Sequence, residues 1–192
     1  MKFLISISLF SAIVYLNSCT SPVQASFLQD SLLNVRNNHS LAGKLYFFAP
    51  EFDSTNLVAT GACDCCSANA VFLDDTCFVY VGYCDDGSTY SKGKYQLSEE
   101  GLVLNFDNIT VEKSYPETDE MDSTGQLSTE FTYNTIIDSP STLVFRKKDF
   151  RGRIFFRSDY AFGAVDTGGT AIEMMKSIRG QGIWDRLAGK EK

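Results

Sequence analysis

From residue 43 onward, apolar and polar positions alternate along short stretches that turn-forming residues separate. This alternation predicts β-strands, and turns at Asp74-Asp75, 85–88 and 98–101 separate those of the first group. The first group of strands is expected at 43–49, 69–73, 76–83, 89–97 and 102–106. Because the turns recur every eight to fourteen residues, consecutive strands can pair as neighbours. The pattern therefore favours an antiparallel meander over the strand and helix alternation of α/β enzymes.

The strand expected at 76–83 is apolar on both of its faces. Alternation places Cys77 and Val79 on one face, and Phe78 and Tyr80 on the other. A strand that is apolar on both sides is covered on both sides. We therefore predict a mainly β protein, in which the meander forms a small lipocalin-like barrel or open barrel. Its interior is filled, and a further element packs outside.

A second group of strands follows the acidic and polar segment 112–125, which has the composition of a loop. These strands are expected at 127–137, 142–147 and 152–157, with 138–141 as a connecting turn. Apolar residues at helical spacing from Ala171 to Ile178 then predict a short C-terminal helix, interrupted at 180–182. The barrel-like domain is thus expected at 41–165 and the helical segment at 166–192.

The beginning of the chain has the pattern of an export signal. Lys2 precedes fourteen apolar, uncharged residues, too few for a membrane-spanning helix. Leu16-Asn17-Ser18-Cys19 then resembles the lipobox of bacterial lipoproteins, and its ending is similar to that of many lipoproteins of the Bacteroides group. This resemblance implies a signal peptide at 1–18 and a lipid on the thiol of Cys19. The alternative is ordinary signal-peptidase cleavage after Ala25.

Acylation of Cys19 implies that the protein is held in the bilayer by its lipid, since two or three acyl chains make anchoring stable. Residues 19–40 are rich in Ser, Asn and Gln and are expected to form a tether between lipid and barrel. Thr20, rather than Asp, follows the cysteine. By resemblance to enteric lipoproteins, this favours the cell outer membrane as the site of the anchor.

The charge balance narrows the choice of partners. The chain has 17 Lys and Arg against 24 Asp and Glu, and loss of residues 1–18 leaves 16 against 24, a formal charge of −8. Such an acidic protein is not expected to bind nucleic acid, whose partners supply cationic contacts. One basic cluster stands apart from this balance. It comprises Arg146, Lys147, Lys148, Arg151 and Arg153, which face the acidic loop or an anionic ligand, or are simply solvated hairpin ends.

Groups suited to catalysis are scarce. The only histidine, His39, lies in the tether, so no catalytic triad can be drawn within the barrel. Asp74-Asp75 and Asp85-Asp86 lie in turns, where Asp side chains commonly bind the backbone. We therefore expect no enzyme and no cofactor, but a module that binds an envelope protein or a small ligand. A hydrolase that uses scattered carboxylates is one alternative.

Five cysteines remain besides Cys19, and an exported compartment favours their oxidation. They are Cys63, Cys65, Cys66, Cys77 and Cys84. Two disulfides and one free thiol are the simplest outcome. Cys77 and Cys84 are seven positions apart and face opposite sides of a regular strand. Each is therefore expected to pair with a member of the 63–66 cluster, so that the cysteines act as structural staples.

The same cluster supports a second hypothesis. Thiolates of Cys63, Cys65 and Cys66 could bind Cu(I) or Zn(II), or sense redox state. A cysteine element ahead of a meander, on a lipid-anchored small barrel, resembles the NlpE-type copper-resistance and envelope-stress lipoproteins, and lipocalin-like lipoproteins generally. The resemblance covers about 60–106 and implies the barrel fold. The CxxC element of that family is replaced here by Cys63-Asp64-Cys65-Cys66.

Overall fold

The computed structural model describes residues 40–61, 64–115 and 131–190. The predicted signal peptide 1–18, Cys19 and nearly all of the tether lie outside these residues. The strands are β1 (Leu45–Ala49), β2 (Glu51–Asp53), β3 (Val58–Thr60), β4 (Ser67–Phe72), β5 (Cys77–Cys84), β6 (Gly87–Leu97), β7 (Gly101–Ser114), β8 (Thr132–Ile137), β9 (Thr142–Phe150), β10 (Arg153–Arg157) and β11 (Phe162–Val165). The helices are α2 (Ala171–Gly180) and α3 (Ile183–Leu187).

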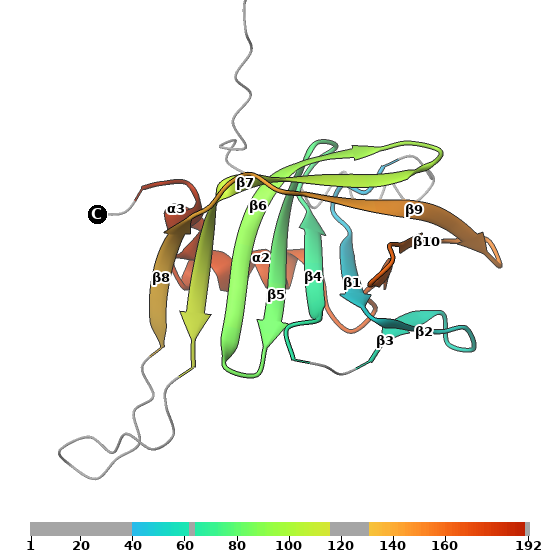
Figure 1. Cartoon of the computed structure of the whole chain (residues 1–192), viewed down its shortest axis with the longest axis horizontal. Helices are drawn as coiled ribbons and strands as arrows, with labels where there is room; N and C mark the ends of the chain where they lie inside the picture. The colour runs from blue at the N-terminus through green and yellow to red at the C-terminus, as the bar shows by residue number, and fades with distance from the viewer. Residues whose placement is uncertain (1–39, 62–63, 116–130, 191–192) are drawn as a thin grey trace, which may run out of the picture.

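Eight of the strands close into an antiparallel barrel, which confirms the predicted fold class (Figure 1). Around the ring they follow the order β1, β4, β5, β6, β7, β9, β10 and β11, and β11 pairs back to β1 with Val165 opposite Tyr46. Strands that are neighbours in the ring therefore follow one another along the chain, as in a meander. The exceptions are the small hairpin of β2 and β3, and β8.

The predicted turn at Asp74-Asp75 joins β4 to β5, and its geometry explains why aspartate stands there. One carboxylate oxygen of Asp74 accepts hydrogen bonds from the backbone N–H groups of Thr76 and Cys77, both at 2.7 Å. The side chain thus satisfies donors at the start of β5. The turns between β5 and β6 and between β6 and β7 also lie where the sequence predicted them.

The connection at 138–141 joins two strands, as predicted, but these strands do not form a hairpin. β8 and β9 do not pair with each other; both pair antiparallel with β7, β9 near its start and β8 near its end. The ladder continues on either side of the connection, because Asp138 N donates to Asn108 O at 2.8 Å and Phe106 N donates to Ser141 O at 2.9 Å. The proline in this connection has no N–H to donate, so one long strand path is interrupted there.

Aromatic and aliphatic side chains from around the ring fill the barrel, as predicted. The rings of Phe48 on β1 and Phe145 on β9 lie 4.8 Å apart, and those of Tyr46 on β1 and Phe156 on β10 lie 5.3 Å apart. β1 and β9 are not neighbours in the sheet, so the first of these contacts crosses the interior. The interior of an eight-stranded barrel is just wide enough for side chains to fill it.

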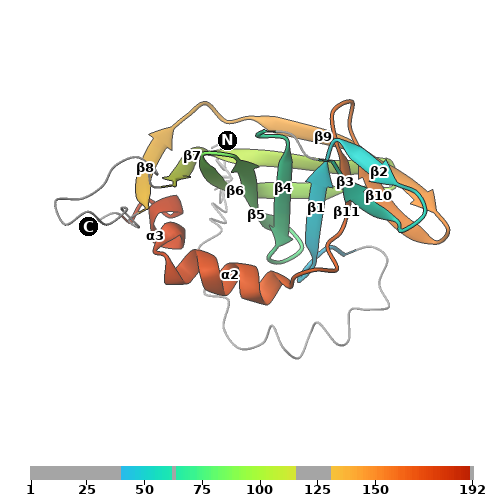
Figure 2. The same ribbon diagram turned by 90° about the horizontal axis from the view of Figure 1, so that it is seen from below.

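The two helices lie against the outer face of the barrel rather than over one of its ends (Figure 2). Met175 and Ile178 of α2 are buried in one cluster with Val79 and Val81 of β5, while Phe78 points to the interior. This confirms that the strand at 76–83 is covered on both sides. Two helices form where a single short one was predicted, because the chain turns between Gly180 and Ile183, with Gly182 at φ 73°.

The hairpin of β2 and β3, which the sequence did not predict, covers another part of the outer face. Phe52 of β2 packs 4.6 Å from the ring of Phe155 on β10 and 5.8 Å from that of Phe162 on β11. These rings form a small outer cluster of their own. Among the described residues, no helix has both the length and the apolar character needed to cross a bilayer.

Candidate functional site

The interior of the barrel is filled by aromatic side chains that contact one another. Rings of Phe72 and Tyr95 lie 4.8 Å apart, those of Phe78 and Phe106 5.1 Å apart, and Phe78 is fully buried. Burial also raises the pKa of Tyr80 to about 12, so its phenol stays neutral at physiological pH. Because side chains fill the interior, we expect binding at the outer surface of the barrel.

A disulfide joins Cys65, which precedes β4, to Cys84 at the end of β5. Cys84 therefore pairs with a member of the 63–66 cluster, as predicted. The carboxylate of Asp64 accepts a hydrogen bond from the backbone N–H of Asp85 at 2.9 Å and lies 3.3 Å from the sulfur of Cys65. Together these contacts hold the segment before β4 against the turn between β5 and β6.

The disulfide links residues 19 positions apart. By the loop-closure argument, a link of this length stabilises the fold by about 3 kcal/mol, chiefly by restricting the unfolded chain. The nearby carboxylate of Asp64 adds negative charge, which disfavours the approach of an attacking thiolate. Both effects suit a cysteine pair that acts as a structural staple.

Of the cysteines outside this disulfide, Cys66 and Cys77 lie within the described residues, whereas Cys63 and Cys19 do not. Neither Cys66 nor Cys77 is a free thiol. The set proposed for copper or zinc, Cys63, Cys65 and Cys66, therefore has no free thiol at either of its two described positions. Metal ligation by Cys65 requires that its disulfide first be reduced.

The second feature is the outward face of the β9–β10 hairpin, here called the basic ribbon. It consists of Arg146, Lys148, Arg153 and Arg157, all exposed, with Arg146 directly opposite Arg157 across the two strands. Their orientation follows from alternation, because Phe145 and Phe156 point into the barrel. Within the described part of the chain, none of the four has a carboxylate partner; the ion pairs there are Lys92–Asp107 and Lys147–Glu99.

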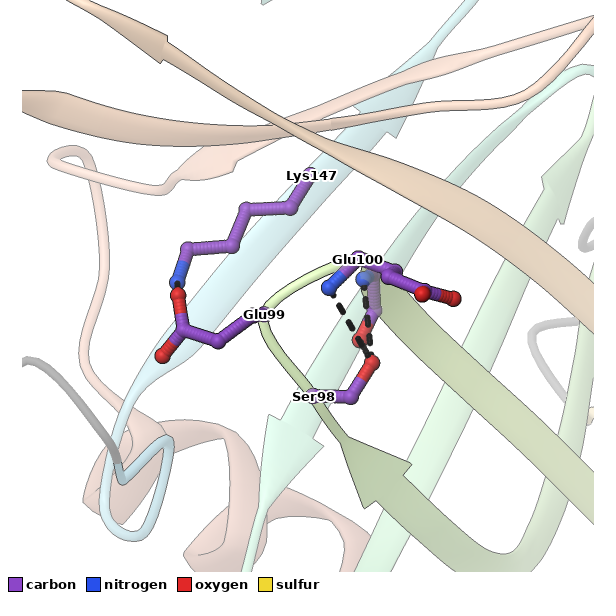
Figure 3. A network of polar contacts seen from close by, with 5 residues as sticks. Ser98, Glu99, Glu100 and Lys147 are labelled. Atoms are coloured by element: carbon purple, nitrogen blue, oxygen red, sulfur yellow. Dashed lines mark hydrogen bonds and ion pairs between the residues drawn. The ribbon is translucent and has the colours of Figure 1, made fainter.

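Lys147, which the sequence analysis grouped with the basic cluster, instead forms an ion pair with Glu99 (Figure 3). Its side chain leaves the opposite face of β9, and its Nζ atom lies 3.4 Å from a carboxylate oxygen of Glu99. Its backbone N–H donates to the carbonyl of Glu100 at 2.8 Å. The hydroxyl of Ser98 accepts hydrogen bonds from the N–H groups of Glu100 and Gly101, at 3.2 and 3.3 Å. Lys147 thus ties β9 to the turn between β6 and β7.

The structure therefore divides the predicted basic cluster and enlarges it. Arg146, Lys148 and Arg153 share one face, Lys147 points to the other, and Arg151 lies in the turn of the hairpin with φ 54°. Arg157 was missed, although it lies four positions after Arg153 on a strand and so must share its face.

The predicted alternative that the basic cluster faces the acidic loop is not tested, because 116–125 lies outside the described residues. The two described ends of that loop are Tyr115 after β7 and Phe131 before β8. β8 and the tip of the β9–β10 hairpin lie at opposite sides of the molecule (Figure 1). This separation follows from the pairing, since β8 and β9 occupy successive stretches of the same edge of β7.

No protein-family model, no curated protein and no solved structure matches the chain. The disulfide between Cys65 and Cys84 constrains the fold, whereas the basic ribbon presents guanidinium and ammonium groups to solvent. Such groups form charge-assisted hydrogen bonds with carboxylates and phosphates, which makes the ribbon the described surface best suited to binding.

Proposed function

We propose that the protein is a lipid-anchored, non-catalytic module of the cell envelope, whose barrel binds a partner through its outer surface. The lipobox-like sequence from Leu16 to Cys19 supports the anchor, and the outer membrane is its proposed location. The non-catalytic role is supported by the use of carboxylates in turns. Asp53, for example, accepts hydrogen bonds from the Asn56 side chain and the N–H groups of Thr55 and Asn56, which lower the pKa of its carboxyl.

One observation carries the choice of an outer surface over an inner cavity. Aromatic rings touch across the barrel, and Phe48, Phe72, Phe78 and Phe156 are each at most 1% exposed. A lipocalin-like protein that stores a small ligand needs an open apolar interior, whereas here side chains occupy that space. A macromolecular partner that contacts the outside of the barrel is therefore the better fit.

The anchor can be tested at the cysteine that the lipobox assigns to lipidation. We expect the Cys19→Ser protein to leave the outer-membrane fraction and to appear as a soluble or inner-membrane precursor that still carries residues 1–18. Fractionation with immunodetection gives its location, and intact mass gives the acyl chains. The matched control is Ser18→Ala, which keeps a small residue before the cysteine. Outer-membrane pelleting of Cys19→Ser with an unchanged mass would contradict the proposal.

A second candidate, the binding of a soft metal, is favoured by one observation. A carboxylate oxygen of Asp64 and the sulfur atoms of Cys65 and Cys84 all lie within 4.8 Å of one another. Reduction of the disulfide by a dithiol consumes two electrons and two protons, oxidises the dithiol to its disulfide, and leaves two thiols beside a carboxylate. Zn(II) could then displace both thiol protons.

Thiol and metal counting separates the two candidates. For the favoured module we expect at most one free thiol per chain in protein isolated without reductant, and no bound copper or zinc. We also expect no stoichiometric zinc uptake after reduction with a phosphine. Zinc bound at one ion per reduced chain, and lost in Asp64→Asn but not in Asp86→Asn, would instead establish the metal site. Elemental analysis and a thiol reagent suffice for both measurements.

A further inference from the structure

We infer that β8 (Thr132–Ile137) is a self-association edge, at which two copies of the chain pair their β8 strands antiparallel to each other. β8 is the last strand in the order of the nine-stranded sheet, and its pairing among the described residues is with β7 alone. It lies at the outside of the sheet (Figure 1). Such pairing goes beyond the proposed function and does not depend on the lipid anchor.

The outer edge of β8 presents backbone groups of alternate residues. Asp138 N donates to Asn108 O, and hydrogen-bonded positions alternate along an antiparallel ladder, so Ile136 also faces β7. The N–H and C=O groups of Tyr133 and Ile137 therefore point away from β7. Among the described residues, neither of these two has a further backbone hydrogen bond. Backbone groups exposed in this way are a template for pairing with another strand.

The composition of β8 lacks the features that usually protect a strand edge. Natural edges are commonly protected by charged side chains, by proline or by very short strands. The stretch 148–150 of β9 is unpaired on its outer edge and contains Lys148 and Asp149, and the corresponding stretch 153–155 of β10 contains Arg153. β8 has six residues, none of them charged and none of them proline. Its edge is therefore suited to pairing rather than protected against it.

A second copy of β8 fits this edge because the strand is complementary to itself. In an antiparallel pair with a two-fold axis midway along β8, Tyr133 lies opposite Ile137 of the second copy, and the same contact repeats across the axis. Pairs of an aromatic and a β-branched side chain are favourable between strands. Ile137 is 76% exposed in the single chain, and this pairing covers it. Because β8 is uncharged, no like charges meet at the axis.

The association is expected to be weak and to strengthen with salt. Pairing along a six-residue edge covers less area than a stable interface needs, so we expect a Kd of about 0.1 mM. Each chain has a formal net charge of −7, so two copies repel each other over a distance. Salt screens this repulsion and leaves the backbone hydrogen bonds of an uncharged edge in place. Association through ion pairs between charged surfaces would show the opposite dependence on salt.

The test follows the molecular mass of the full chain in neutral detergent, with micelles in excess, by sedimentation equilibrium up to about 1 mM protein. We expect a monomer–dimer equilibrium that shifts toward the dimer as salt rises. Ile137→Lys places a charge on the edge and is expected to weaken the dimer by about tenfold or more. The matched control, Ile172→Lys, alters an isoleucine that is 46% exposed on α2 and should leave the dimer unchanged.

Two further measurements locate the contact. Ile137→Pro removes an N–H that points away from β7, so it costs no hydrogen bond within the sheet and is expected to weaken the dimer as Ile137→Lys does. Urea unfolding checks that both variants are folded. In the unaltered chain, exchange of the Tyr133 and Ile137 amide hydrogens with solvent is expected to slow as the dimer forms.

A monomer at the highest concentration, with freely exchanging Tyr133 and Ile137 amides, would overturn the inference and leave the edge to a strand of a different protein. Protection of these amides at every concentration would also overturn it, because a segment of the same chain would then cover the edge. The same holds for a dimer that weakens as salt rises, or that Ile172→Lys and Ile137→Lys weaken equally. None of these results bears on the anchor, which Cys19→Ser tests separately.

Discussion

Replacing Phe48 by alanine is expected to lower the free energy of unfolding by about 3–5 kcal/mol. The Phe48 ring is 1% exposed and lies 4.8 Å from the ring of Phe145 across the barrel. It also occupies the space that a Cβ atom on the facing Gly163 would need. The barrel wall is hydrogen-bonded all round, so it has little freedom to collapse into the cavity left behind.

Urea unfolding followed by circular dichroism gives the change in stability of Phe48→Ala. Phe150→Ala is the matched control, because the same ring is removed from an exposed position, and we expect it to cost less than about 1 kcal/mol. A similar small loss for Phe48→Ala would mean that the interior is not tightly filled. It would also reopen the case for a small ligand inside the barrel.

The protein is expected to unfold in alkali between about pH 10 and pH 12. Burial raises the pKa of both Tyr46 and Tyr80 to about 12, from an ordinary value of 10.0. The folded state therefore favours the neutral phenol. Its stabilising effect is complete below pH 10 and is lost as the pH rises through 12, at about 3 kcal/mol for each tyrosine.

The test follows tyrosinate absorbance and circular dichroism together as the pH rises. We expect the phenols of Tyr46 and Tyr80 to ionise only as the barrel unfolds. Tyr46→Phe, which removes one of them, should raise the pH of unfolding. Tyr160→Phe should not, since Tyr160 is 88% exposed. Ionisation of all tyrosines near pH 10 without unfolding would show that Tyr46 and Tyr80 are accessible to solvent.

The parts of the fold that depend on local pattern could be predicted from the sequence. Alternation in 76–83 predicted both that β5 is covered on its two faces and which residues face each side, because a pleated strand has a period of two. The aspartate at position 74 in the turn could be predicted for a similar reason, since the backbone hydrogen bonds that Asp74 accepts reach only two or three residues ahead. The same alternation along β10 would have placed Arg157 on the face that carries Arg153.

Features that depend on distant pairing could not be predicted in this way. The four residues of β11, Phe-Gly-Ala-Val, have no clear alternation, and their strand conformation depends on pairing with β1 and β10. The continuation of β8 into β9 along β7 was also missed, because Pro140 and its neighbours have the composition of an ordinary turn. The choice of Cys65 as the partner of Cys84 required the folded path of the chain.

The pairing of β1 with β11 has a consequence for how the chain folds. The hairpins from β4 to β7 join close neighbours in sequence, so they can form early and independently of the rest. The ring cannot close until Val165 meets Tyr46, and closure of so long a loop is slow compared with hairpin formation. Until then, β1 lacks its partner β11, and α2 does not yet cover the apolar outer face of β5. The chain must therefore remain unaggregated as an open sheet until its last sixty or so residues arrive.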